Sequence, residues 1–253
     1  TSFCMNVAVN AVKHNFNCAF FSLEMTKKEL ASRIISQETN IGSRNILYSP
    51  LSKENISTIK SKKDEISEYK IFIDGSSNNN IGNIISSIKA MVLKYGIKFA
   101  IIDYLQLVTS DTKNLTTEQQ VADIARRLKN TAKELNIPII LLSQLSRNSE
   151  NPYPTLSRLR GSGQIEEAAD IVMFAYRPEF YLQFKPFIKF PEPFQDIDVK
   201  GKGLMIVAKG RSIGCFDFLC SFDGNTTKFS DYHEGMEITG QIPPNESFDT
   251  APF

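Results

Sequence analysis

The sequence has few of the residues that bind zinc or form disulfides. Its two histidines, His14 and His233, are isolated, and its four cysteines include no CxxC pair and no neighbouring histidine cluster. A structural zinc site needs several such ligands at short spacing, so the sequence argues against one. The cysteines fit reduced thiols, and we expect a cytosolic protein.

Long apolar runs and a strong charge of one sign are also missing. No stretch of about eighteen apolar residues occurs, and the first residues lack the basic-then-apolar pattern of a signal peptide. We therefore expect a cytoplasmic chain with no membrane partner. The net charge is only +1, so the chain is no polycation, and any nucleic acid would have to be bound by local loops.

The 253 residues are enough for one large domain or two small ones, and 42% hydrophobic residues are ordinary for a globular protein. Continuously apolar segments alternate with helical patterns, which indicates a mostly parallel sheet with helices on both faces. The last strands follow one another without helices, so we expect antiparallel C-terminal strands. The predicted strands are 17–22, 70–74, 98–103, 137–143, 170–176, 204–208 and 215–222. The predicted helices are 2–14, 26–39, 52–67, 82–95 and 117–135.

Two capping boxes set helix starts in this prediction. Thr26 is followed by Glu29, and Thr117 by Gln120. At this spacing the hydroxyl and the third side chain each hydrogen-bond to a free backbone N–H of the helix end. We therefore predict that a helix begins at each of these two threonines.

Polar residues follow three of the apolar strands, at the edge where ligands bind in a parallel sheet. Asp103 ends a strand of four apolar residues, the pattern of a carboxylate that helps hold Mg²⁺ against nucleotide phosphates. Glu24 is placed to activate a water, and Gln144 to contact a γ-phosphate or a water. Each also has a structural interpretation: Asp103 as a turn cap, Glu24 as a helix-entry carboxylate, and Gln144 as an amide that satisfies loop backbone.

The chain opens on a helical pattern with no strand before it. A phosphate-binding loop ends in Gly-Lys-Ser/Thr, and its last hydroxyl starts a helix and binds Mg²⁺. We expect Thr1 to be that residue, with the first strand and most of the loop lying before it, outside this sequence.

Five segments together resemble replicative hexameric helicases of the DnaB type, in order from Thr1 to about Phe229. Asp-Tyr-Leu-Gln-Leu and Ser-Gln-Leu-Ser-Arg after strands are more specific than a strand ending in aspartate. The segments are Phe20–Met25, Ile101–Leu107, Leu142–Arg147, Leu159–Ile171 and Ala175–Glu179.

This resemblance implies a RecA-like P-loop NTPase domain that forms a homohexameric ring, uses ATP and Mg²⁺, and holds each nucleotide between neighbours. It implies catalytic roles for Glu24 as base, Asp103 as metal-binding acid and Gln144 as phosphate sensor. Lys209 and Arg211 would reach the neighbour's γ-phosphate, where a guanidinium neutralises developing charge; without the resemblance they would be interpreted as a solvated turn. The implied ATP contacts are Thr1, Ser2 and Arg33, and the implied Mg²⁺ ligands are Thr1 and Asp103.

Single-stranded DNA is the implied partner of two loops, 108–117 and 147–163, where glycines let backbone N–H groups approach phosphates closely. The alternative is a polar loop with incidental charge. Where the family usually has Arg-Glu-Ser-Gly, this chain has a glycine second. The implied DNA-binding residues are Lys113, Arg147, Arg158, Arg160, Gly161 and Gly163.

We predict an ATPase domain over 1–230, with a surface insertion at 182–203, and a loosely held tail over 231–253. The expected function is a helicase motor that translocates on single-stranded DNA and unwinds duplex, with a primase and a helicase loader as possible partners. The alternatives are another RecA-like ATPase, such as a recombinase or RadA-type protein, and a non-hydrolysing DNA-binding ring.

Overall fold

The computed structural model describes residues 1–75, 79–146, 151–159 and 162–232. The chain divides into two compact units. The first comprises residues 1–144 and 223–229, and the second comprises 145–222 and, among the described residues, 230–232. Each unit is described by itself.

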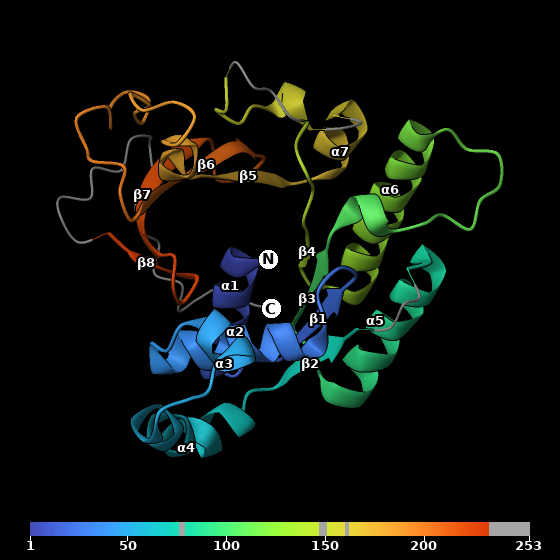
Figure 1. Ribbon diagram of the computed structural model, residues 1–253. Coiled ribbons are helices and arrows are strands. Elements are labelled where there is room, and N and C mark those ends of the chain that lie inside the picture. The colour runs from blue at the N-terminus through green and yellow to red at the C-terminus, as the bar shows by residue number, and fades with distance from the viewer. Residues whose placement is uncertain (76–78, 147–150, 160–161, 233–253) are drawn as a thin grey trace. The chain divides into compact units, whose positions relative to one another are not determined.

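The first unit is a parallel four-stranded sheet with helices on two sides (Figure 1). The strand order is β2-β1-β3-β4, and all pairs are parallel. Helices α1 and α2 lie on one side of the strands, and α5 and α6 lie on the other. The elements are α1 (Ser2–Lys13), β1 (Cys18–Ser22), α2 (Lys27–Thr39), α3 (Ser43–Tyr48), α4 (Lys53–Ser67), β2 (Ile71–Asp74), α5 (Ile81–Tyr95), β3 (Phe99–Asp103), the 3₁₀ turn η1 (Leu105–Leu107), α6 (Thr117–Leu135) and β4 (Ile139–Leu141).

The two central strands explain why the sequence reads as continuously apolar there. Every residue of β1 and β3 is buried, while β2 and β4 at the edges are only half-buried. A strand covered on both faces cannot alternate polar and apolar residues. On the α1 side, Met5 and Ala8 of the helix pack into one cluster with Phe20 and Ile101 of the central strands, which fixes α1 against the sheet.

Thr26 forms the predicted capping box with Glu29, in which both hydrogen bonds are present. The second predicted box is displaced by one residue, because the cap of α6 is Thr116 and its partner is Gln119. The prediction of a box from Thr117 to Gln120 is therefore wrong. Two consecutive threonines precede two consecutive glutamines, so the sequence pattern fits both registers and only the helix start decides between them.

The second unit is built on antiparallel strands, as expected for the C-terminal part. Strand β6 pairs antiparallel with both β5 and β7, and β8 lies beyond β7. Its apolar cluster joins Val172, Phe174, Leu204, Leu219 and Tyr232, among others. The elements are η2 (Leu156–Arg158), α7 (Ser162–Ala168), β5 (Ile171–Tyr176), η3 (Pro178–Tyr181), β6 (Lys202–Gly210), β7 (Phe216–Asp223) and β8 (Lys228–Asp231), of which Asp223, Lys228 and Phe229 are assigned to the first unit.

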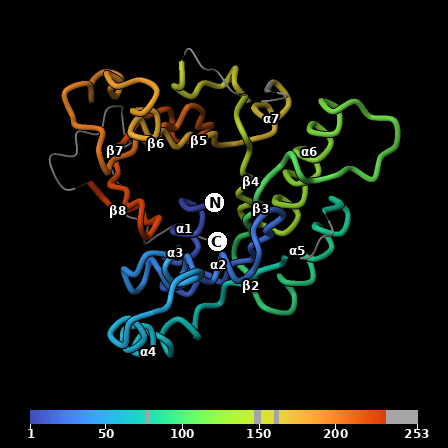
Figure 2. The backbone as a smooth tube through the Cα atoms, viewed as in Figure 1, coloured from blue at the N-terminus to red at the C-terminus, as the bar shows by residue number. Residues whose placement is uncertain are grey.

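All seven predicted strands are present, although β4 is shorter than predicted and β6 is longer. Helices α3 and α7 and strand β8 were not predicted. Residues 182–201 contain no helix or strand and form a long connection between η3 and β6 (Figure 2). Within the described part of the chain, no helix is long and apolar enough to cross a membrane.

The corrected capping register predicts different effects for two adjacent threonines. Thr116→Ala removes the hydroxyl that accepts from the Gln119 N–H at 3.3 Å and should lower the free energy of unfolding by about 0.5–2 kcal/mol. Thr117→Ala, the matched control at the first helical position, should cost almost nothing. Urea unfolding of both variants measures this, and an equal loss in the two would show that the cap is elsewhere.

Candidate functional site at the carboxyl end of the parallel sheet

The strand register brings the polar residues that follow β1, β3 and β4 to one edge of the sheet. Ser22 of β1 pairs with Asp103 of β3, and Ile102 pairs with Leu141 of β4. The N–H of Leu23 donates to the carbonyl oxygen of Asp103 at 3.0 Å. Glu24 and Gln144 follow within a few residues of these strand ends, so the sheet places them at the same edge as Asp103.

Thr1 meets Asp103 at this edge. The Thr1 hydroxyl donates a hydrogen bond to Oδ2 of Asp103, a carboxylate with only 4% of its surface exposed. Thr1 is the N-cap residue of α1, yet its side chain makes no capping bond. A threonine at this position normally accepts from the first-turn N–H groups. Here its hydroxyl is directed to the strand-end carboxylate instead, so the first-turn N–H groups of α1 are left for another acceptor.

A cation lies close to this pair. Nη1 of Arg33, on α2, donates to the Ser2 hydroxyl at 2.6 Å. Burial lowers the pKa of the half-buried Arg33 guanidinium, and the Asp103 carboxylate opposes that shift. Arg33, Ser2, Thr1 and Asp103 therefore form one group of hydroxyls and charges at the start of α1, where the helix dipole favours an anion.

Thr1 and Asp103 fit a magnesium ion. Both supply oxygen ligands, which Mg²⁺ prefers, and Mg²⁺ commonly takes one or two protein carboxylates and completes its shell with water and phosphate oxygens. No group of three or more His, Cys, Asp or Glu side chains able to hold a metal occurs among the described residues. A site of one carboxylate and one hydroxyl therefore suits a metal that arrives with phosphates better than a dedicated protein cage.

Cys4 is an inert neighbour of this site. Burial is the main cause that raises the pKa of its thiol to about 11, and the Asp103 carboxylate adds to the shift. A thiol with such a pKa stays protonated at neutral pH and is a poor nucleophile. The site's chemistry therefore has to come from its oxygens and cations.

Glu24 lies in a short turn after β1 and is exposed. The turn is closed by Ser22, whose hydroxyl donates to the Met25 carbonyl at 2.7 Å and accepts from the Met25 N–H at 3.2 Å. Because the cap of α2 is Thr26, Glu24 is not needed to start that helix. The hydrogen-bonded turn therefore fixes the backbone at Glu24, while the carboxylate is accessible to solvent.

The side chain of Gln106 holds the backbone around Gln144. Its Nε2 donates to the Ser143 hydroxyl at 2.9 Å and to the Gln144 carbonyl at 3.3 Å, and its Oε1 accepts from the Gln144 N–H at 3.1 Å. Sequence reasoning missed this role, although Gln106 stands inside the quoted Asp-Tyr-Leu-Gln-Leu segment. The only available signal was a polar residue between two leucines after a strand.

Lys209 and Arg211 lie in the second unit, at the end of β6. Lys209 Nζ donates to the carbonyl of Glu166, and one guanidinium N–H of Arg211 donates to the carbonyl of Glu167. Arg211 also pairs with the Asp170 carboxylate at 3.2 Å. These carbonyls belong to the last turn of α7, where cations satisfy free backbone oxygens and oppose the helix dipole.

Arg158 is bound to loop backbone. Its guanidinium donates to the carbonyls of Ser146, Pro152 and Tyr153 at 2.8 to 2.9 Å. The Ser146 N–H in turn donates to the Arg158 carbonyl at 2.8 Å. Arg158 thus closes the base of the loop that starts after Ser146. Its predicted contact with DNA stays a prediction.

The other predicted DNA-binding residues are only partly covered by the structure. Lys113 is exposed in the connection between η1 and α6. Gly163 lies in the first turn of α7, and a Cβ added there would have open space around it. Arg147, Arg160 and Gly161 lie outside the described residues, so their predicted roles remain untested.

The sequence and the fold match known proteins over nearly the whole described chain. Residues 1–231 match the model of the DnaB-like helicase C terminal domain, and the chain belongs to this family. It is 38% identical to a probable replicative DNA helicase of Trieres chinensis over 92% of this chain and 50% of that protein. It is 34% identical to the replicative DNA helicase DnaB of Leifsonia xyli subsp. xyli (strain CTCB07), over 87% and 46%.

Solved structures agree. A DnaB-like replicative helicase, described with its interactions with primase, superposes with a TM-score of 0.81 and 30% identity over 92% of this chain and 54% of that one. A second solved structure, of an ATPase domain, gives a TM-score of 0.81 and 29% identity over 92% and 80%. The chain spans about half the length of the curated relatives it matches. The expected family and the expected class of fold are thereby confirmed.

The Gln106 contacts predict a local effect on the Gln144 backbone. Gln106→Leu removes the acceptor of the Gln144 N–H, and losing a hydrogen bond of about 1 kcal/mol should speed hydrogen exchange at that amide about fivefold. Gln120→Leu is the matched control, because the Gln120 side chain donates to the Leu115 carbonyl and not to the Gln144 backbone. Unchanged exchange at Gln144 in the Gln106 variant would refute the assigned contact.

Proposed function

We propose, from the premise that this chain belongs to the DnaB-like helicase C-terminal domain family, that it is the ATPase motor of a replicative DNA helicase. In this proposal it hydrolyses ATP with Mg²⁺, assembles as a homohexameric ring, and couples hydrolysis to translocation on single-stranded DNA and to duplex unwinding. The named activities of its relatives support this function.

The observation that carries the proposal is the contact between the Thr1 hydroxyl and the buried Asp103 carboxylate, beside the Arg33–Ser2 bond. Burying a carboxylate without a hydrogen-bond partner is costly. Here the partner is the hydroxyl that begins a helix, at the sheet edge where such folds bind phosphates. We assign ATP contacts to Thr1, Ser2 and Arg33, and Mg²⁺ contacts to Thr1 and Asp103.

Bound Mg²⁺ would neutralise charge on the phosphate oxygens and keep them in line for transfer. The protein's own part of the step falls to two strand-end residues. Glu24 would accept a proton from the attacking water, since its carboxylate is exposed beyond β1 and is not used as a helix cap. Gln144, on backbone that Gln106 holds, would contact the γ-phosphate.

Lys209 and Arg211 would complete the site of a neighbouring subunit. A guanidinium supplied from the next chain neutralises charge on the transferred phosphoryl group and makes hydrolysis depend on subunit position. In the isolated chain both side chains donate to carbonyls of α7. We infer that reaching the neighbour's phosphate requires them to exchange these acceptors for phosphate oxygens.

Single-stranded DNA would contact the 108–117 and 147–163 loops, in which Lys113, Arg147, Arg160, Gly161 and Gly163 are the proposed contact residues. Arg158 is also a proposed contact residue, and five N–H···O contacts from its guanidinium to backbone carbonyls hold it in place. Backbone N–H groups of these loops could also donate hydrogen bonds directly to DNA phosphates.

The proposed ATPase domain spans 1–230, with 182–203 as an insertion and 231–253 as a tail. A primase and a helicase loader are proposed partners, and four free thiols support a reducing, cytoplasmic location. A recombinase or RadA-type ATPase and a non-hydrolysing DNA-binding ring are the alternatives. The names of the relatives favour the helicase over both.

Asp103→Asn tests the metal-binding assignment. It keeps the shape of the side chain but removes the charge, so DNA-stimulated ATP turnover should fall by about 100-fold or more, because metal charge stabilisation is worth several kcal/mol. Asp74→Asn is the matched control, since Asp74 ends strand β2 at the same edge, with β1 between it and β3. Equal turnover in the Asp103 variant and the wild type would exclude the proposed site.

If Arg211 acts on the nucleotide of a neighbouring subunit, mixing two inactive variants should restore ATPase activity. Arg211→Ala and Asp103→Asn should each lose ATPase activity alone. Their mixture should regain part of it, because some interfaces combine an intact Asp103 with an intact Arg211. A mixture of Arg211→Ala with Lys209→Ala should not recover. One subunit supplies both side chains to an interface, so every interface in this mixture lacks one of them. No recovery in the first mixture would mean that Arg211 acts within its own chain or only holds α7.

A further inference from the structure

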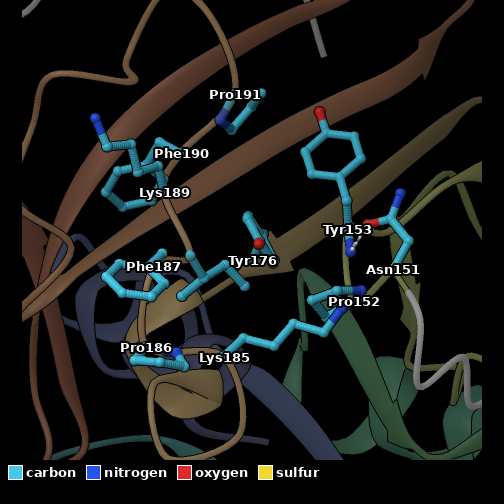
Figure 3. A pocket seen from close by; sticks show the side chains of 11 residues that line it. Asn151, Pro152, Tyr153, Tyr176, Lys185, Pro186, Phe187, Lys189, Phe190 and Pro191 are labelled. Atoms are coloured by element: carbon cyan, nitrogen blue, oxygen red, sulfur yellow. Dashed lines mark hydrogen bonds between the residues drawn. The ribbon is translucent and has the colours of Figure 1, made fainter.

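The second unit contains an aromatic cavity that the proposed ATPase chemistry does not use. Its volume is about 570 Å³, and its walls come from two segments, residues 151–153 and 185–191, with Tyr176 of β5 between them. In Figure 3, Tyr153 stands on one side, and Phe187, Lys189 and Phe190 stand on the other. The rings of Tyr153 and Tyr176 meet edge to face with centroids 5.3 Å apart, so the base of the cavity is packed.

The segment that forms one wall is unusually apolar for a surface. Phe187 in this wall is 92% exposed, and Phe184 and Phe180, which precede the wall segment in the chain, are 73% and 60% exposed. Large side chains scattered singly on a surface are ordinary, but a group of phenylalanines beside a cavity marks a contact site. Burying such a ring against a partner is favourable, because it removes apolar area from water.

The charged residues that line the cavity are all cations. They are Lys185 and Lys189, and no carboxylate is among the lining residues. Asp217 is the carboxylate that acts electrostatically on Tyr153, but it is not among the lining residues. It is half-buried, and burial raises the pKa of its carboxyl. The site therefore suits a ligand that presents apolar or aromatic groups together with negative charge.

We propose that the 233–253 segment of this chain docks in this cavity. The segment carries four acidic residues and no lysine or arginine, and it alternates them with apolar groups, three prolines and two phenylalanines. Its acidic residues are Glu234, Glu237, Glu246 and Asp249. Phe248 beside Asp249 offers the cavity a ring and a carboxylate in adjacent positions, which matches the Phe187–Lys189 wall in both respects.

The segment starts close enough to reach the cavity within one chain. Tyr232, the last described residue, belongs to the same apolar cluster as Tyr176 and Phe190, which line the cavity. Lys202 lies over the Tyr232 ring with Nζ 5.3 Å from its centroid, which helps fix this starting point. The 21 residues that follow can extend to about 70 Å. Because attachment gives the segment a millimolar effective concentration, a few weak contacts are enough to keep it bound.

The absence of tryptophan makes a direct test possible. Phe187→Trp in the 253-residue chain puts the only indole beside the cavity, at a position exposed enough to tolerate it. Docking predicts a blue-shifted emission that moves toward the red when Phe248→Ser and Phe253→Ser are added. High salt should cause the same red shift, because the screening length falls to about 3 Å at 1 M. Leu93→Trp on α5, at a residue 88% exposed, is the control and should respond to neither change.

Charge exchange tests the pairing. Lys185→Glu with Lys189→Glu should release the segment, and adding Lys in place of the four acidic residues should restore the blue shift. Faster hydrogen exchange over 184–190 in the Phe248→Ser/Phe253→Ser variant of the otherwise unaltered chain provides a second readout that does not depend on an indole. The proposal would be overturned if the emission of the Phe187→Trp indole stayed the same after every change in the 233–253 segment. A blue shift that disappears on dilution would also overturn it, because that result assigns the cavity to a second copy.

Discussion

The hydroxyl of Thr1 donates to the carboxylate of Asp103, and the geometry of the proposed nucleotide site depends on that contact. It can form because β1 and β3 pair in parallel with Ser22 opposite Asp103, and because apolar packing presses α1 against these strands. The buried carboxylate then lies beside a helix start, and it acts electrostatically on the Arg33 guanidinium. The same register brings Glu24 and Gln144 to this edge, where Gln106 holds the Gln144 backbone.

The second unit connects two proposed functions through one short helix. Lys209 and Arg211, proposed to act on a neighbour's nucleotide, donate to the last carbonyls of α7. The residues before α7 belong to the proposed DNA-binding loop, and Arg158 closes the base of that loop. If Lys209 or Arg211 moved to another acceptor, the last carbonyls of α7 would lose these hydrogen bonds. Helix α7 and the loop belong to the same unit.

The strands of the parallel sheet and the polar residues at their ends could be predicted from the sequence. Buried parallel strands are continuous apolar runs, and the polar residues that follow them are therefore easy to identify. Asp103, Glu24 and Gln144 were found in this way. The backbone contacts of Gln106 and Arg158 were not predicted, because they depend on backbone groups that the fold brings near. The short helix α3 buries no residue and so leaves no apolar period. The capping register at Thr116 was ambiguous because each threonine has a glutamine three residues later.

Thr1 and Asp103 are proposed to hold one magnesium ion together with ATP. A double-mutant cycle on ATP affinity tests it most directly, with Thr1→Ala, Asp103→Ala and the double variant measured by calorimetry with Mg²⁺ and with chelator. If the two residues share one ion, the two losses should be coupled by about 0.5–3 kcal/mol when Mg²⁺ is present, and the coupling should fall when it is removed. Strictly additive losses in Mg²⁺ would contradict a shared ion.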